Sequence, residues 1–210
     1  MNPTDFQLIL VDPNADLCDA FRSHFRRQAN VPVVQGRFES LPEFDCMVSA
    51  ANSFGLMDGG VDGAITRFFG LALMDRVQRH VIEHFRGEQP VGTSFIVETG
   101  HEKHPFVAHT PTMRVPMRIA ATDNVYQAMW AMLLAVWHHN QSSARRINIV
   151  ACPGLGTATG RVSPSSAARQ MATAYRHFHN PPETISWPYA TARQHAVGLG
   201  GDDGFQRLTE

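Results

Sequence analysis

Short apolar runs alternate with longer amphipathic stretches along most of the chain. Apolar runs bounded by turn residues predict buried strands, and they occupy Phe6 to Val11, Val31 to Gln35, Asp45 to Ala50, Thr93 to Thr99, Phe106 to Thr110 and Ile147 to Ala151. Stretches with apolar positions at helical spacing predict helices, over Asp16 to Arg27, Ile65 to Phe85, Asp123 or Asn124 to Asn140, and Ser165 to Phe178. Strands that alternate with helices predict an α/β fold with a largely parallel sheet.

The alternation fades near the C-terminus. We therefore divide the chain into a domain over residues 1–180 and a C-terminal extension over residues 181–210. Gly198 to Gly204 is rich in glycine, so part of the extension is expected to be flexible. Thr184 to Tyr189 is compatible with one last short strand.

Composition and charge narrow the class of protein. Of 210 residues, 43% are hydrophobic and 18% charged, and the net charge of −1 argues against an obligatory nucleic-acid partner. The three cysteines form no CxxC pair, which favours a reducing, cytoplasmic compartment. Neither a signal peptide nor an apolar run long enough to span a membrane is visible, so we expect a soluble protein without a membrane partner. The oligomeric state is not indicated.

The segment after the third predicted strand is rich in glycine. Asn52 ends that strand, and Gly55, Gly59, Gly60 and Gly63 follow before the next predicted helix. A helix start offers free N–H groups, and glycines let the backbone approach phosphate oxygens closely. Ligands of open α/β sheets bind at this end of the strands. Glycines alone also fit a plain tight turn.

A second glycine-rich loop follows the last predicted strand. It contains Gly154, Gly156 and Gly160, with Thr157 and Thr159 between the last two glycines, and a predicted helix follows. Backbone N–H groups and threonine hydroxyls are suitable donors for a diphosphate. A Rossmann dinucleotide site is the main competitor. It fits poorly because the last glycine interval is wrong, the loop follows the last strand, and no acidic residue lies about twenty positions on.

These two loops resemble the signature of the macrodomain family. Ala50-Ala51-Asn52 and Gly59-Gly60-Val61-Asp62-Gly63-Ala64-Ile65 are similar to its first loop, and the second loop is similar to the one that wraps the diphosphate. The resemblance implies a three-layer α/β/α sandwich with a mixed, largely parallel six- or seven-stranded sheet. It implies ADP-ribose as ligand, with Asn52 at the distal ribose and Asp62 positioning a water, so both become catalytic candidates. The expected ligand-binding residues are Ala51, Gly59, Gly60, Val61, Gly154, Gly156, Thr157, Ala158, Thr159 and Gly160.

The chain departs from the family pattern at three positions. Ser49 replaces the first Asn of the family's Asn-Ala-Ala-Asn, and Thr66 lies where one hydrolytic branch carries a His. Arg37 replaces the acid that accepts from adenine, and a guanidinium has no acceptor. Arg37 is kept as a ligand-binding candidate, stacked on adenine or reading another base. Arg114, at the expected cleft edge, is a further candidate for a phosphate, or belongs to a rigid connection with a solvated side chain.

Three functions remain open from the sequence. The first is an ADP-ribosyl hydrolase that acts on ADP-ribose linked through its distal ribose to a protein or other acceptor. The second is a reader that binds ADP-ribose without turnover, and the third is a pocket adapted to another nucleotide. No cofactor or metal is expected. His80-Val81-Ile82-Glu83-His84 matches a zinc-peptidase pattern but lacks a marked third ligand, and a solvated helix face is its ordinary interpretation.

Overall fold

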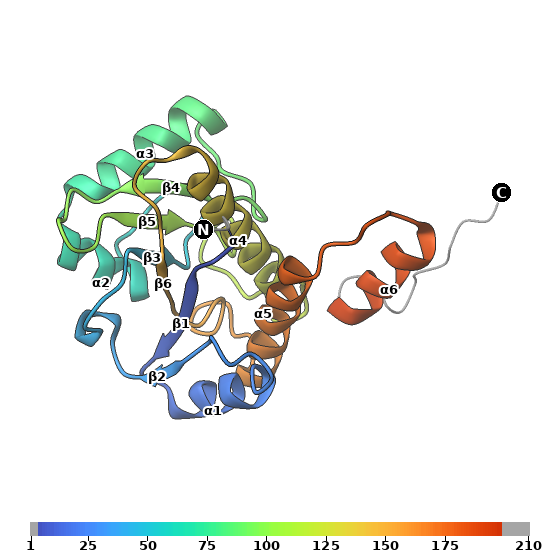
Figure 1. Ribbon diagram of the computed structural model, residues 1–210. Coiled ribbons are helices and arrows are strands. Elements are labelled where there is room, and N and C mark those ends of the chain that lie inside the picture. Colours follow the sequence, from blue (N-terminus) through green and yellow to red (C-terminus); the bar gives the residue numbers. More distant parts are fainter. Residues whose placement is uncertain (1–3, 199–210) are drawn as a thin grey trace.

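The computed structural model describes residues 4–198 and has one six-stranded sheet. The strands are β1 (Gln7–Asp12), β2 (Val33–Gln35), β3 (Cys46–Ser49), β4 (Phe95–Glu98), β5 (Phe106–His109) and β6 (Ile149–Cys152). Their order is β2-β1-β6-β3-β5-β4, and only β4 runs antiparallel to its neighbour (Figure 1). The prediction of a mixed, largely parallel sheet is confirmed, with six strands.

Two layers of helices cover the sheet. One face packs against α1 (Ala15–His24), α4 (Asn124–Ser142) and α5 (Pro164–His179), and the other against α2 (Gly60–Phe69) and α3 (Ala72–Phe85) (Figure 1). Successive strand side chains point to opposite faces, so Leu8 and Leu10 of β1 enter the first core while Ile9 and Val11 enter the second. The three-layer α/β/α sandwich is therefore formed by two separate apolar cores on one sheet.

The prediction of a single helix over Ile65 to Phe85 is wrong. The segment forms two helices, and the break lies at Gly70, whose φ of 91° only glycine adopts readily. The first helix also begins earlier than expected, at Gly60, because Gly60 to Gly63 form its first turn instead of a loop. This early start brings the N-terminus of α2 directly to the end of β3.

Side-chain caps fix the starts of two helices that flank the sheet. Asn14 accepts a hydrogen bond from the N–H of Leu17 at the start of α1. Ser163 accepts from the N–H of Ser166, and Pro164 occupies the first turn of α5, as the sequence predicts. The loop before α5 is thereby held in place from its C-terminal side.

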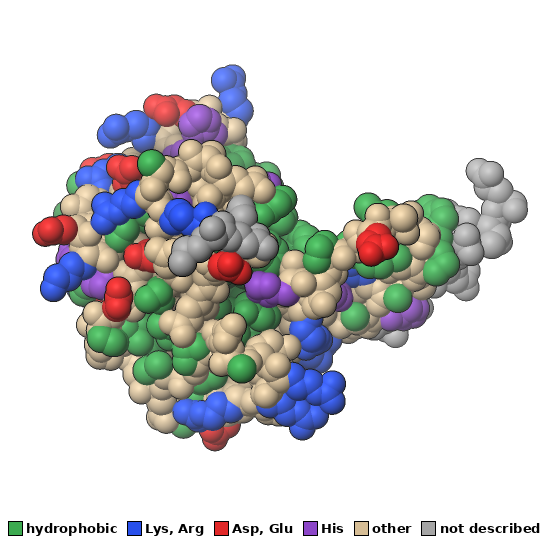
Figure 2. All heavy atoms as spheres, in the orientation of Figure 1, with side chains coloured by type: hydrophobic (Ala, Val, Ile, Leu, Met, Phe, Trp, Pro, Cys, Tyr) green, Lys and Arg blue, Asp and Glu red, His purple; other side chains and the backbone are tan. Residues whose placement is uncertain are grey.

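The C-terminal extension contains a helix, α6 (Trp187–Val197), so the possible strand at Thr184 to Tyr189 is wrong. Ser186 caps this helix by accepting from the N–H of Tyr189. The helix forms a lobe beside the body (Figures 1 and 2). Of the expected flexible stretch from Gly198 to Gly204, residues 199–204 lie outside the described part. No helix among the described residues is long and apolar enough to cross a membrane.

Candidate functional site

A cleft lies at the carboxyl ends of the parallel strands and has two adjoining chambers. The Asn52 chamber, about 160 Å³, is lined by the loops after β3, β5 and β6: Ala50, Ala51, Asn52, Leu56, Asp58, Gly59, Gly60, Val61, Asp62, Thr112, Met113, Pro116, Gly156, Thr157, Ala158, Thr159 and Gly160. The Arg37 chamber, about 440 Å³, also receives the ends of β1 and β2: Val11, Asp12, Pro13, Asn14, Gly36, Arg37, Phe38, Glu39, Met47, Gly60, Val61, Ala64, Arg67, Pro153, Thr157 and Ala158. Both chambers share Gly60, Val61, Thr157 and Ala158.

The N-terminus of α2 contributes free backbone donors to the shared part of the cleft. Gly59 is its N-cap residue and has no side chain to satisfy the first N–H groups, and the first helical bond runs from Gly63 to Gly59. Within residues 4–198 the N–H groups of Gly60, Val61 and Asp62 have no acceptor. An uncapped helix start combines such donors with the positive end of the helix dipole and therefore favours an anion.

The loop after β6 turns a second set of backbone donors toward the same place. Gly156 has a φ of 69°, and the N–H of Val162 returns to its carbonyl, so the intervening residues form a closed loop. No acceptor for the N–H groups of Thr157, Ala158 and Thr159 is found in the described part of the chain. The two loops thus meet across Gly60, Val61, Thr157 and Ala158. Unpaired N–H groups from both sides suit the oxygens of a diphosphate.

Asp62 lies in the first turn of α2 and lines the Asn52 chamber. Its side chain is only 6% exposed, and its Oδ1 accepts a hydrogen bond of 2.8 Å from the hydroxyl of Ser49 at the end of β3. Burial raises the pKa of Asp62, the Ser49 hydrogen bond lowers it and the nearby Asp58 raises it, with a net result of about 7. The carboxyl group can therefore exchange a proton near neutral pH.

The side chain of Asn52 is engaged by its own loop. Its Oδ1 accepts from the N–H groups of Phe54 (3.0 Å) and Leu56 (3.3 Å), and its Nδ2 donates to the carbonyl of Leu56 (2.7 Å). The residue also forms an isolated parallel bridge to Met113. Asn52 borders the chamber, and the second hydrogen of its amide is left for a ligand. Its expected contact with a ribose stays a prediction.

Arg37 and Arg67 line the Arg37 chamber together with Asp12 and Asn14. The Asp12 carboxylate accepts from the N–H groups of Asn14 (2.9 Å) and Gly154 (3.2 Å), which ties β1 to the loop after β6. The sequence analysis does not predict Asp12 as a site residue. Its position at the carboxyl end of the first strand, where ligands of α/β sheets bind, could have indicated it. The sequence analysis also does not predict Arg67, one helical turn after Gly63, because α2 was expected to begin later.

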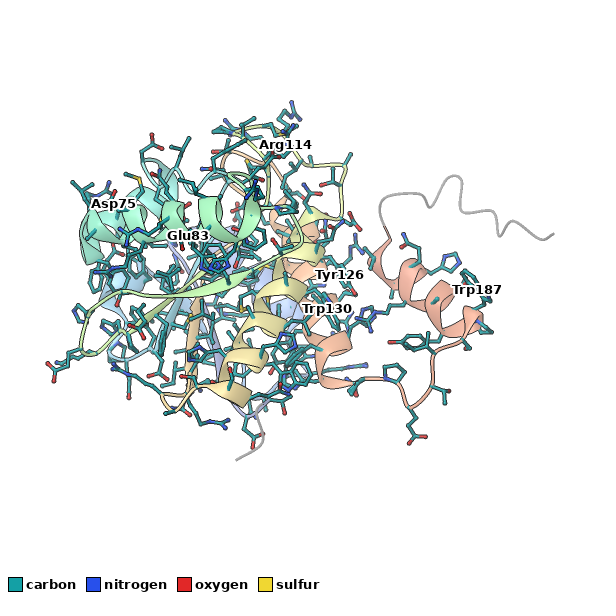
Figure 3. The ribbon with its side chains drawn as sticks, turned by 90° about the horizontal axis from the view of Figure 1, so that it is seen from above. Asp75, Glu83, Arg114, Tyr126, Trp130 and Trp187 are labelled. Carbon is teal, nitrogen blue, oxygen red and sulfur yellow. The ribbon has the colours of Figure 1, made fainter. Side chains whose placement is uncertain are left out.

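Two predicted ligand-binding residues do not border the cleft. Gly154 lies beneath the loop, where an added Cβ would come within 2.3 Å of Leu17. Arg114, labelled in Figure 3, is two-thirds exposed. It forms a bidentate pair with Glu88. Its neighbours Met113 and Pro116 line the Asn52 chamber instead. The expected phosphate contact of Arg114 stays a prediction.

Thr66 and the histidine pair of α3 have structural partners. Thr66, where one hydrolytic branch carries a His, donates its hydroxyl to the carbonyl of Met57 (2.8 Å), and Met57 is fully buried. His80 stacks on Phe95 and adjoins His84. Among residues 4–198 no group of three His, Cys, Asp or Glu side chains is placed to hold a metal ion.

Comparisons with known proteins agree with this architecture. The model of the Macro domain family matches residues 48–171. An uncharacterized protein of Aquifex aeolicus is 33% identical over 149 residues, which cover 71% of this chain and 82% of that protein. An O-acetyl-ADP-ribose deacetylase of Escherichia fergusonii is 36% identical over 83 residues, covering 40% of this chain and 45% of the deacetylase.

Solved structures share the fold. A mutant Oceanobacillus iheyensis macrodomain with ADPR has a TM-score of 0.58 at 18% identity, and the similarity covers 94% of this chain and 95% of that one. The macrodomain of Mycobacterium tuberculosis DarG has a TM-score of 0.54 at 18% identity, covering 64% of this chain and 83% of the other.

Proposed function

Because the chain belongs to the Macro domain family, we propose that its cleft binds ADP-ribose and hydrolyses ADP-ribose that is linked through its distal ribose to a protein or other acceptor. The observation that carries binding is the meeting of two loops at the shared part of the cleft. There residues at the start of α2 and in the loop after β6 line the same space, and within residues 4–198 their N–H groups have no acceptor. The diphosphate lies at this junction, with the distal ribose in the Asn52 chamber and the nucleoside in the Arg37 chamber.

Hydrolysis is supported by the position of Asp62. Departure of the acceptor from the anomeric carbon of the ribose develops positive, oxocarbenium-like charge. A carboxylate in the Asn52 chamber stabilises that charge and orients the attacking water. The diphosphate, held by backbone donors, supplies remote binding energy that positions the reacting end. The proposal also agrees with the relative that acts on an ADP-ribose derivative, the O-acetyl-ADP-ribose deacetylase of Escherichia fergusonii.

Asp62→Asn tests the hydrolytic part of the proposal. The amide keeps the size of the side chain but carries no charge, so we expect turnover of an ADP-ribosylated protein to fall about 100-fold or more. Affinity for free ADP-ribose, measured by calorimetry, should change little because the backbone donors remain. A variant that releases ADP-ribose as fast as the wild type contradicts the role of Asp62. A wild type that binds ADP-ribose without releasing it from any substrate is a reader.

A pocket for a nucleotide other than an adenine nucleotide is the second candidate. The observation that favours it is Arg37, together with Arg67, in the chamber expected to hold the base. A guanidinium donates hydrogen bonds and accepts none, whereas adenine offers a donor at its exocyclic amine. Calorimetry with ADP-ribose, ADP and their guanine and uridine counterparts decides this point. Tighter binding of a counterpart selects the second candidate, and tighter binding of ADP-ribose selects the first.

A further inference from the structure

Ser49 is a fully buried serine whose hydroxyl meets the carboxyl group of Asp62. It is the last residue of β3, where it pairs in register with His109 of β5, and its carbonyl accepts from the N–H of Thr110 (3.1 Å). The backbone of Ser49 is therefore fixed by the sheet. Its hydroxyl lies 2.8 Å from Oδ1 of Asp62. Ser49 is not among the residues that line the Asn52 chamber, so it acts from behind Asp62.

Two opposing influences act on the Asp62 carboxyl group. Burial in the first turn of α2 and the negative charge of Asp58, in the loop before α2, both favour the protonated form. Within residues 4–198 the side chain that favours the charged form is Ser49, by donating a hydrogen bond from β3. No ion pair from an Arg or Lys reaches Asp62 in this part of the chain. The neutral hydroxyl of Ser49 thus stabilises the charged form of Asp62, as an Arg or Lys does in a salt bridge.

We infer that Ser49 is a positioning residue for Asp62: its hydroxyl, fixed at the end of β3, donates to Oδ1 and holds the carboxyl group in the orientation in which it borders the Asn52 chamber. The inference rests on the proposed hydrolase function for its role in turnover. The effect of the Ser49 hydroxyl on the pKa of the buried Asp62 carboxyl group does not depend on turnover.

The chain offers a matched control for this hydroxyl. Ser53 is also fully buried and lies four residues further on, but its Oγ has no hydrogen-bond partner among the described residues. Ser49→Ala and Ser53→Ala therefore each delete one buried hydroxyl of the same size. Only Ser49→Ala removes a contact with Asp62. Ser49→Cys is a second test variant, because it keeps the shape of the side chain and weakens the donor.

The titration of Asp62 is measured directly by the carbon-13 signal of its carboxyl group between about pH 5 and pH 9, a range that brackets the folded pKa. A hydrogen bond to a charged group corresponds to a shift of about one pH unit or more. We expect the Asp62 midpoint to rise by that amount in Ser49→Ala, to rise less in Ser49→Cys, and to stay unchanged in Ser53→Ala. An Asp62 midpoint at the wild-type value in Ser49→Ala or in Ser49→Cys overturns the inference.

Turnover adds a second readout. The acid limb of the kcat profile should move upward with the titration in Ser49→Ala, while KM for the ADP-ribosylated substrate stays near the wild-type value. A merely structural role would lower kcat equally at all pH values, and that result overturns the positioning role. If the wild type shows no turnover, the proposed hydrolase function fails. The carbon-13 titration then still decides whether Ser49 sets the charge of Asp62.

Discussion

The carboxyl group of Asp62 links the chemistry of the site to the stability of the protein. Its folded pKa of about 7 exceeds its ordinary value of 3.8 because the group is buried. Between these two pH values the folded state binds more protons than the unfolded state, so the stability contributed by Asp62 falls as pH rises. Above pH 7 the folded protein carries a charge on this buried carboxyl group, and the charge lowers the stability of the folded state.

Asp62→Asn should therefore stabilise the protein at high pH. The amide cannot ionise, so the variant does not carry the buried charge. The pKa shift of Asp62 corresponds to a destabilisation by that charge of up to about 4 kcal/mol. We expect the free energy of unfolding by urea to match the wild type near pH 4 and to exceed it at pH 8. Equal stability of the two proteins at pH 8 would contradict a strongly raised pKa for Asp62.

Residue types predict which loops form the candidate cleft, but side-chain directions cannot be read from them. Gly60, Val61, Thr157 and Ala158 were predicted as ligand-binding residues and line both chambers. Arg114 was chosen for its charge, yet its direction depends on Glu88, which lies 26 positions earlier and has no local link to it. The sequence predicts which loops approach each other, whereas pairing across loops decides which side chain reaches the cleft.

At the scale of elements, the strand pattern was predictable because each apolar run is bounded by turn residues. The break between α2 and α3 was not predicted, because both helices bury apolar residues at compatible spacing on one core. Only the positive φ of Gly70 separates them, and a lone glycine inside a helical pattern does not state its φ. The first turn of α2 is not predicted either, because it contains Gly60 and Gly63 and glycine has low helix propensity.

The loop after β6 depends on close backbone contacts that a methyl group disrupts. An added Cβ at Gly160 would lie 2.4 Å from the carbonyl oxygen of Gly156 and 2.8 Å from Ile119. We expect Gly160→Ala to lower the free energy of unfolding by about 1–3 kcal/mol and to weaken ADP-ribose binding, because the loop must shift.

Gly36→Ala is the matched control in thermal unfolding. Its added Cβ meets only Ser40, at an ordinary 3.5 Å, and its stability should stay close to that of the wild type. Wild-type stability and affinity in Gly160→Ala would show that the loop after β6 tolerates a side chain at this point.

At the scale of the whole molecule, the described part of the extension contacts the domain through α6. The guanidinium of Arg193 in α6 lies 4.3 Å from the ring centroid of Trp130, and Arg169 of α5 donates to the carbonyl of Val197 (2.6 Å). Figure 3 shows Tyr126 and Trp130 on the side of α4 that faces α6, with Trp187 on α6 itself. None of these residues lines either chamber.

Removal of residues 181–210 should leave ligand binding intact. Among the described residues, the chain loses the cation–π contact of Arg193 with Trp130, the burial of Val197 and the hydrogen bonds Arg193–Tyr126 and Arg169–Val197. We therefore expect the free energy of unfolding to fall by about 1–3 kcal/mol. Affinity for ADP-ribose, measured by calorimetry, should equal that of the full chain. Arg193→Gln in the full chain should reproduce part of the stability loss. Weaker binding by the truncated chain would show that residues 181–210 contribute to ligand binding. It would contradict the prediction that residues 1–180 form the complete binding domain.

The order of strands also constrains how the protein is synthesised. β2 pairs with β1, and β1 pairs on its other side with β6, while β3, β5 and β4 form a contiguous group that β6 joins to β1 and β2. On the ribosome, the first two strands must wait for residues 149–152 before the sheet closes, with apolar strand edges uncovered meanwhile. A nascent chain arrested before β6 holds two sheet fragments, and the addition of β6 joins them into one sheet.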